Sequence, residues 1–209
     1  MIRNNKTFKA WMAVAIVVAI LLIDQIIKIE VKTNMTLGEA KRVTDWFYIE
    51  FIENNGMAYG IKFINKLVLS LFRLFAIGFI GYYLAKIIKK NVAPFGYVVL
   101  IAMVLAGAAG NLIDCLFYGL IFDASTPFTV SQFVPFGEGY STFLHGKVVD
   151  MFYFPIIQTT WPEWVPYFGG SEYVFFSPVF NFADACISVG VVALLLFYRK
   201  QLEVLFSNK

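Results

Sequence analysis

The stretch VFFSPVFNFADACISVGVVALLLFY, residues 174–198, decides the class of fold. It is long enough to cross a bilayer, which takes about 20 mostly apolar residues. Among strongly polar residues, only Asn181 and Asp184 interrupt it. A carboxylate placed in hydrocarbon costs about 3 kcal/mol or more, so such residues are rare and usually functional. The stretch therefore predicts an integral membrane protein with a functional carboxylate in its last span.

Three other apolar runs are long enough to span a bilayer, at about 10–29, 67–85 and 94–117. The composition agrees, because the 209 residues are 59% hydrophobic and 15% charged, with a mean hydropathy of +0.71. Soluble domains are about 25% charged. We therefore predict an all-α integral membrane bundle of four transmembrane helices, with residues 1–209 as a single membrane domain.

The first run also has the start of a secretory signal peptide, because Arg3, Lys6 and Lys9 precede it. No small-residue cleavage site follows, and the run instead ends in Asp24 and Lys28. We expect this run to be retained as the first span.

Basic residues are divided unevenly between the flanks of the four runs. One set of flanks is rich in Lys and Arg and includes the acid Glu203. The positive-inside rule places these flanks in the cytoplasm. Both termini and the loop around Lys90 are thus expected inside, and the loops 30–66 and 118–173 outside.

The outer loops are too long to be simple turns. Residues 42–52, RVTDWFYIEFI, are rich in β-branched and aromatic side chains and predict a strand, and residues 53–60 predict a turn after it. The fold prediction therefore includes a small extracytoplasmic β-containing region. Four aromatic residues of the second loop suit the headgroup zone of the membrane: Trp161, Trp164, Tyr167 and Tyr173.

The costly polar residues of the four spans lie at one depth. With this orientation each span carries them toward its outer side, and Asp150 lies in the loop that returns to the fourth span. Polar groups inside a membrane normally face the bundle interior and contact one another. We expect a shared polar site beneath the outer surface, which includes Asp24, Lys28, Arg73, Asn111, Asp114, Asn181 and Asp184.

Spacing within the spans supports this convergence. Asp24 and Lys28 are four residues apart on one helical face, and we favour a structural ion pair over catalysis for them. Asn111 and Asp114 are three apart, as are Asn181 and Asp184. Residues 106–110, AGAAG, precede Asn111, and small residues let helices approach closely.

Asp150 and Asp184 are the candidate catalytic residues. Two aspartates in one site share a proton, so the ionised one can deprotonate a water while the protonated one polarises a peptide carbonyl. No metal or cofactor is expected, because the single histidine, His145, belongs to no cluster with metal-ligand spacing. Cys115 and Cys186 lie in apolar runs, and buried thiols are a better interpretation than a disulfide.

Five motifs, in order along the chain, resemble those of lipoprotein signal peptidase, the bacterial signal peptidase II. Each motif is weak alone, but five in order on four spans are specific. They are Asp24-x-x-x-Lys28, NNGMAYG at 54–60, GNLID at 110–114, VVDM at 148–151 and FNFAD at 180–184.

The resemblance implies an aspartyl protease of the bacterial cytoplasmic (inner) membrane, with its active site near the outer face. It would cut a diacylglyceryl-modified prolipoprotein just before the lipidated cysteine, with membrane lipid around it and globomycin as an inhibitor. No nucleic acid partner is expected, and a monomer is compatible with the sequence. Asp150 and Asp184 would be the dyad, and seven residues would shape the site or hold substrate: Asp24, Lys28, Asn54, Gly56, Asn111, Asp114 and Asn181.

The chain departs from the family pattern in two places. The family usually has arginine after the aspartate at 114, whereas this chain has Cys115. We hypothesise that Arg73 supplies that charge from the second span. The stretches 119–147 and 156–178 are longer than expected, and they could form a lid or an aromatic platform on the membrane; we favour the platform.

The alternative function is a component of a small ion- or proton-coupled transporter, which also uses intramembrane carboxylates. A transport pathway needs polar groups down to the cytoplasmic side. Here the inner halves of the spans are almost purely apolar, which favours the peptidase.

Overall fold

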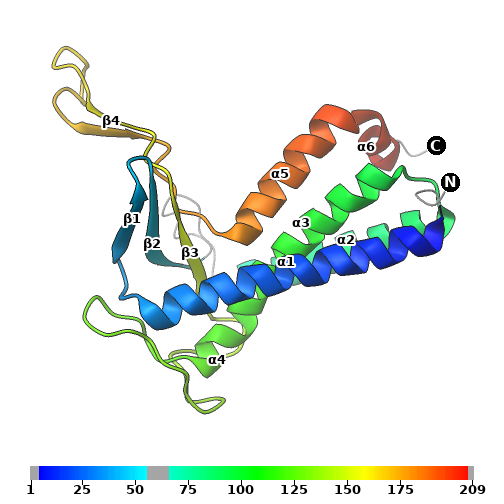
Figure 1. Ribbon diagram of the computed structural model, residues 1–209, viewed down its shortest axis with the longest axis horizontal. Helices are drawn as coiled ribbons and strands as arrows, with labels where there is room; N and C mark the ends of the chain where they lie inside the picture. Colours follow the sequence, from blue (N-terminus) through cyan, green and yellow to red (C-terminus); the bar gives the residue numbers. More distant parts are fainter. Residues whose placement is uncertain (1–4, 56–65, 207–209) are drawn as a thin grey trace.

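The computed structural model describes residues 5–55 and 66–206 (Figure 1). Gly56 and most of the predicted turn at 53–60 lie outside the described residues. The main helices are α1 (Lys6–Asn34), α2 (Lys66–Lys90), α3 (Phe95–Ile113) and α5 (Phe182–Phe197). A π-helical turn, η3 (Asp114–Tyr118), and α4 (Gly119–Ile121) prolong α3, and α6 (Arg199–Phe206) follows α5.

Within the described residues, three helices are long and apolar enough to cross a membrane: α1, α2 and the continuous helical segment Phe95–Ile121. The predicted first three spans therefore lie within real helices. The fourth does not extend as far as predicted, because α5 has only 16 residues and is thus about 24 Å long, against about 30 Å of hydrocarbon.

The expectation of one span from 174 to 198 is wrong at its beginning. Residues 172–175 form a strand, and Pro178 lies between that strand and the helix. Proline disfavours helical backbone at the residue before it. Asn181 then caps α5, because its side chain accepts a hydrogen bond from the backbone N–H of Asp184.

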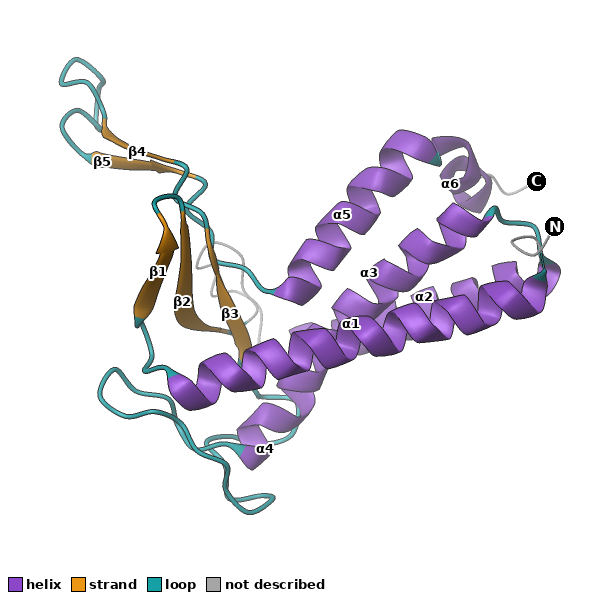
Figure 2. Cartoon of the chain, in the orientation of Figure 1, coloured by secondary structure: helices purple, strands orange, loops and turns teal. Residues whose placement is uncertain are grey.

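In the part of the chain that the structure describes, three strands form an antiparallel sheet in the order β1 (Ala40–Thr44), β2 (Phe47–Asn54), β3 (Val148–Tyr153) (Figure 2). The prediction of one strand over 42–52 is wrong, because the chain reverses between Thr44 and Phe47 and forms a hairpin. The polar Asp45 in that reversal is a typical turn residue. A second hairpin, β4 (Ile157–Thr160) with β5 (Glu172–Phe175), projects beyond the sheet in Figure 2.

Helix α3 packs against α1, α2 and α5. Its glycines allow this close approach: a Cβ at Gly107 would lie 2.4 Å from the backbone oxygen of Ala183 in α5. A Cβ at Gly110 would lie 2.6 Å from Oδ2 of Asp24 in α1. The small residues that precede Asn111 therefore bring α1, α3 and α5 together at the depth of the polar residues.

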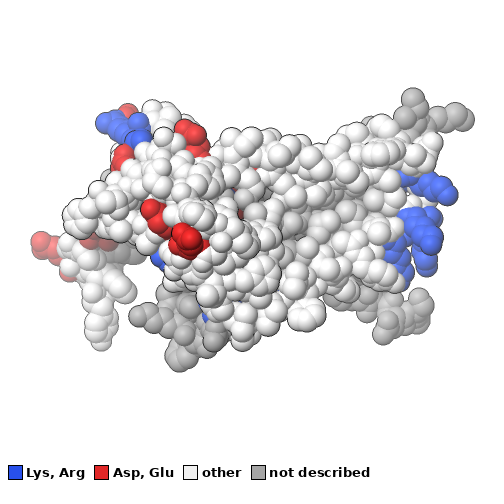
Figure 3. Space-filling view, turned by 90° about the horizontal axis from the view of Figure 1, so that it is seen from below, with Lys and Arg blue, Asp and Glu red and all other residues white. Residues whose placement is uncertain are grey.

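Charge is divided between the two ends of the molecule. In the face shown in Figure 3, basic side chains gather without acidic ones at the end that carries the termini, whereas the sheet end carries acidic side chains together with some basic ones. Figure 1 shows that α1 starts, and α6 lies, at the same end as the connection from α2 to α3. This arrangement matches the charge division predicted from the sequence.

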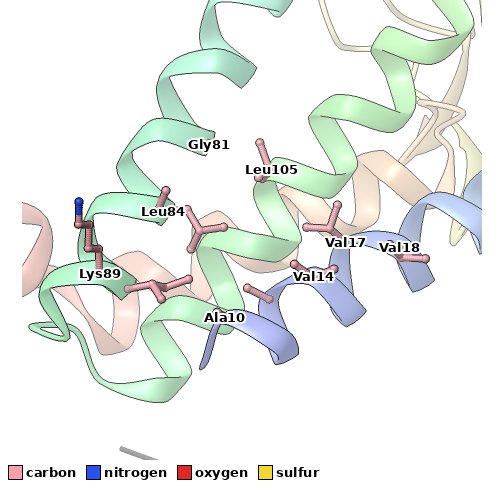
Figure 4. Close-up of a pocket in the computed structure, with 11 residues that line it drawn as sticks. Ala10, Val14, Val17, Val18, Gly81, Leu84, Lys89 and Leu105 are labelled. Atoms are coloured by element: carbon pink, nitrogen blue, oxygen red, sulfur yellow. The ribbon is translucent and has the colours of Figure 1, made fainter. Parts of the chain in front are cut away.

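An apolar groove of about 500 Å³ lies between α1 and α2 toward the basic end. Its walls include Val14, Val17 and Leu84, and Lys89 lies at its border (Figure 4). The stretch of α1 that lines it, Ala10–Val18, precedes Asp24 by more than a helical turn. The groove is therefore separate from the polar site.

Candidate active site

Asp150 lies in the middle of β3, opposite Ile52 of β2, and is only 2% exposed. Its Oδ1 accepts a hydrogen bond of 2.7 Å from Nδ2 of Asn181. Its Oδ2 accepts one of 3.2 Å from Nδ2 of Asn54, the last residue of β2. Two amide groups from different elements thus orient this carboxyl group.

Asp184 lies in the first turn of α5 and is partly exposed. Its Oδ1 accepts a hydrogen bond of 2.7 Å from Nδ2 of Asn111 in α3. Its backbone N–H donates to Oδ1 of Asn181 at 2.9 Å, and its Oδ2 accepts from the backbone N–H of Asn181 at 3.5 Å. This reciprocal cap explains the spacing of three residues between Asn181 and Asp184.

Two asparagines connect the aspartates. Nδ2 of Asn181 donates both to Asp150 and to Oδ1 of Asn111, at 3.0 Å for the second bond. Asn111 in turn donates to Asp184. The chain Asp150–Asn181–Asn111–Asp184 therefore fixes the two carboxyl groups relative to each other through side-chain amides.

Lys28, in α1, supports this series of hydrogen-bonded side chains. Its ammonium group lies 3.0 Å from Asp24 Oδ2 and 2.8 Å from Asp114 Oδ2, and all three side chains are completely buried. It also donates to Oδ1 of Asn111 at 2.9 Å. The predicted pair of Asp24 and Lys28 is present, and the same ammonium group orients the asparagine that contacts Asp184.

The two other carboxylates of this cluster hold backbone groups. Asp24 Oδ1 accepts from the N–H of Ala183 at 3.0 Å, and Asp114 Oδ2 accepts from the N–H of Val149 at 3.3 Å. Ala183 precedes Asp184 and Val149 precedes Asp150. These carboxylates thus position the segments that carry the candidate catalytic pair.

Gln25 also belongs to this cluster, although it was not among the site residues predicted from the sequence. Its Nε2 donates to Asp114 Oδ1 at 2.9 Å, and its Oε1 accepts from the hydroxyl of Tyr118 at 3.1 Å. A polar amide beside Asp24 in the first span was the available signal.

Burial raises the pKa of the Asp150 carboxyl group to about 7, and the negative charge of Asp184 adds to this effect. Hydrogen bonds from Asn54 and Asn181 and the charge of Lys28 act in the opposite direction but are outweighed. Asp150 can therefore carry a proton near neutral pH, as one member of an acid–base pair must.

Four other residues discussed from the sequence lie outside the candidate catalytic pair. Arg73 donates to Sγ of Cys115 at 3.2 Å, whereas the cation beside Asp114 is Lys28. Cys115 and Cys186 are both free and buried thiols. Nδ1 of His145 interacts within its own turn, with Thr142 Oγ1 and Phe143 O.

No group of three or more His, Cys, Asp or Glu residues within 5–55 and 66–206 is arranged to hold a metal ion. The donors around the two aspartates are instead amides and one ammonium group. What the described site offers is thus a pair of carboxyl groups with different surroundings.

Comparisons with known proteins agree with the motifs. The family model described as signal peptidase (SPase) II matches residues 16–199. The lipoprotein signal peptidase of Porphyromonas gingivalis is 49% identical over 195 residues, which cover 93% of this chain and 86% of that protein. The lipoprotein signal peptidase of Amoebophilus asiaticus is 34% identical over 203 residues, which cover 94% of this chain and 81% of that protein.

The fold is also shared with a solved bacterial membrane enzyme. The TM-score is 0.60 at 24% identity, over 94% of this chain and 92% of the other. The ordered motifs, the family match over residues 16–199 and these relatives lead to one conclusion: the chain belongs to the signal peptidase II family of aspartic peptidases.

Proposed function

We propose that this chain is an intramembrane aspartyl endopeptidase that removes the signal peptide from diacylglyceryl-modified prolipoproteins. It cuts the peptide bond just before the lipidated cysteine. The observation that carries the proposal is the amide chain that connects Asp150 to Asp184. The names of the relatives supply the substrate class.

The two aspartates divide the acid–base work. Asp184 is in the first turn of α5, where the helix dipole favours negative charge, and it is the more exposed of the two. It takes a proton from the attacking water. Asp150 is buried and has the raised pKa, so it donates its proton to the scissile carbonyl oxygen. Asp184 then passes its proton to the leaving amine, and Asp150 recovers its own from the collapsing hydroxyl group.

The membrane arrangement supports this substrate. We propose that the single domain 1–209 crosses the bacterial cytoplasmic membrane four times, with α5 as the fourth crossing and both termini inside. Helix α5 is apolar, and α6 lies at the end of the molecule where α1 starts. Both ends of the chain would then be on one side of the membrane, which requires an even number of crossings. The site then lies near the outer face, where the diacylglyceryl group of the substrate anchors the scissile bond.

The other parts of the site take supporting roles in this proposal. Asn54, Gly56, Asn111, Asp114 and Asn181 shape it or hold substrate backbone, with Asp24 and Lys28 behind them. The enzyme works without a cofactor, as a monomer, and globomycin inhibits it.

The direct test is incubation of the purified protein with a diacylglyceryl-modified prolipoprotein, with and without globomycin. We expect release of the signal peptide, and inhibition by globomycin. Asp150→Asn and Asp184→Asn should each lower the cleavage rate by roughly 10²–10⁴-fold, because each removes one proton-transfer group.

The matched control is Asp45→Asn, which makes the same change in the β1–β2 turn, where the carboxylate is 86% exposed. It should cleave like wild type. Cleavage by either dyad variant at a rate near that of wild type, in protein of normal folded yield, would disprove the dyad.

A further inference from the structure

A second buried ion cluster lies on the outer side of the active site, around Glu53 of β2. Its Oε1 is 2.6 Å from Nζ of Lys32, and its Oε2 is 2.8 Å from Nζ of Lys147. The side chains of Lys32 and Glu53 are 0% and 2% exposed. Burial alone would raise the pKa of Glu53, but the charge of Lys32 and the hydrogen bonds from both lysines hold it below its usual range.

The long outer segment 122–147 forms much of the surroundings of this cluster. Ser125 Oγ donates to Glu53 Oε1 at 2.8 Å and accepts from Lys32 Nζ at 2.8 Å. The Lys32 ammonium group lies 5.2 Å from the ring centre of Phe122 and 5.1 Å from that of Tyr140. Several buried contacts therefore fix this segment to α1 and β2. It is a fixed support for the cluster rather than a movable lid.

The cluster is directly connected to β2 and β3, the paired strands that carry Asn54 and Asp150. Glu53 is opposite Val149, and Asn54 is opposite Val148, in the pairing of β2 with β3. Asn54, the residue after Glu53, donates to Asp150. A shift of Glu53 would therefore move Asn54 and change the surroundings of Asp150.

Helix α1 joins the two clusters. Lys28 and Lys32 are four residues apart and lie on one helical face. Lys28 contacts Asn111, which holds Asp184, whereas Lys32 contacts Glu53, which precedes the residue that holds Asp150.

We propose that Lys32 and Glu53 are positioning residues of this peptidase: with Lys28, they make α1 the common support that sets the separation of the two aspartates. Ion pairs buried this deeply are poor sources of stability, because desolvation offsets the attraction. They instead fix the relative positions of the charged groups. Here they fix Glu53, and with it the next residue, Asn54, which donates a hydrogen bond to Asp150. This inference rests on the proposed function, since it assigns Asp150 a part in cleavage.

The test is the pH–rate profile of Glu53→Gln with the lipidated prolipoprotein. Loss of the Lys32 pair should withdraw Asn54 from Asp150 and so remove a hydrogen bond that lowers the pKa of that carboxyl group. We expect kcat to fall about 10-fold with KM unchanged, as for a small misplacement of a catalytic group. We also expect the alkaline limb of the profile to move to higher pH.

The direction of this movement separates positioning from other effects. Removal of a negative charge near Asp150 would by itself lower its pKa and move the limb to lower pH. General loss of folded protein would lower the rate at every pH and leave the limb in place. Either result would overturn the proposal.

Two further variants keep the test decisive. Lys32→Met with Glu53→Gln removes both buried charges, so it should fold even where the single variant does not, and it should show the same low kcat. Glu50→Gln makes the same charge change elsewhere on β2, opposite Ala40, and should behave like wild type. Wild-type kcat in the double variant would overturn the positioning role. Failure of the wild-type protein itself to cleave would instead count against the proposed function.

Discussion

At the residue scale, burial distinguishes two chemically identical side chains. Asp150 lies within β3 of the sheet and is 2% exposed, whereas Asp184 is at the capped start of a helix and partly exposed. The low-polarity surroundings of Asp150 favour its neutral form, and the helix start favours a negative charge on Asp184. The two aspartates therefore differ in their surroundings, and the different roles proposed for them rest on position rather than on chemistry.

This difference predicts the pH dependence of cleavage. The pKa of Asp150 is raised to about 7, so the group is protonated below that pH and loses its proton above it. If Asp150 is the proton donor to the scissile carbonyl, the cleavage rate should fall as pH rises through about 7. Initial rates measured from pH 5 to 9 would show this limb, and a rate that climbs steadily across this interval would contradict the assignment.

Residue spacing revealed part of the site but not all of it. Asp24 and Lys28 were recognised by their spacing of four. One further step of four leads to Lys32, which was not among the predicted site residues. Its partner Glu53 is 21 residues away along the chain, on a strand. Only the docking of β2 against α1 shows that these two charges meet.

At the element scale, the closeness of α3 and α5 controls the contact between Asn111 and Asp184. Gly107→Ala would place a Cβ 2.4 Å from the backbone oxygen of Ala183, which no side-chain rotation can relieve. We expect a loss of about 1–3 kcal/mol in stability, typical of overpacking. The cleavage rate should also fall by about 10-fold or more if Asp184 is catalytic, because the helices must separate beside it.

The matched control is Gly78→Ala in α2, where an added Cβ has no atom within 4 Å. It should leave both the melting temperature and the cleavage rate close to wild type. Equal behaviour of the two variants would show that the approach of α3 to α5 does not limit the site.

The start of α5 shows why element boundaries were harder to predict than element type. The apolar run from 174 has the composition of a span throughout, yet its first residues pair with β4. Pro178 and the cap at Asn181 were visible in the sequence, but hydrophobicity alone does not record them. Local backbone chemistry, rather than apolar length, decided where the helix begins.

At the scale of the whole molecule, the division of charge predicts an orientation that labelling can test. We expect a membrane-impermeant maleimide to label Thr159→Cys in β4 on intact cells, because the sheet end faces outward in the proposed topology. Lys90→Cys, at the basic end of α2, should react only after the membrane is permeabilised. Both positions are exposed, and the native Cys115 and Cys186 are buried and serve as the unlabelled background. Labelling of position 90 from outside would reverse the orientation.

The sequence by itself determined the membrane class, the presence of three long apolar helices and the motifs that belong to signal peptidase II. These depend on composition and local spacing, which a chain carries before it folds. Only the tertiary structure decided the pairing of β2 with β3, the close approach of α3 to α1 and α5, and the contacts of Asn54 with Asp150 and of Lys32 with Glu53. Those features depend on contacts between residues far apart in the chain, where the cost of burying each polar group is met by a partner that only folding brings near.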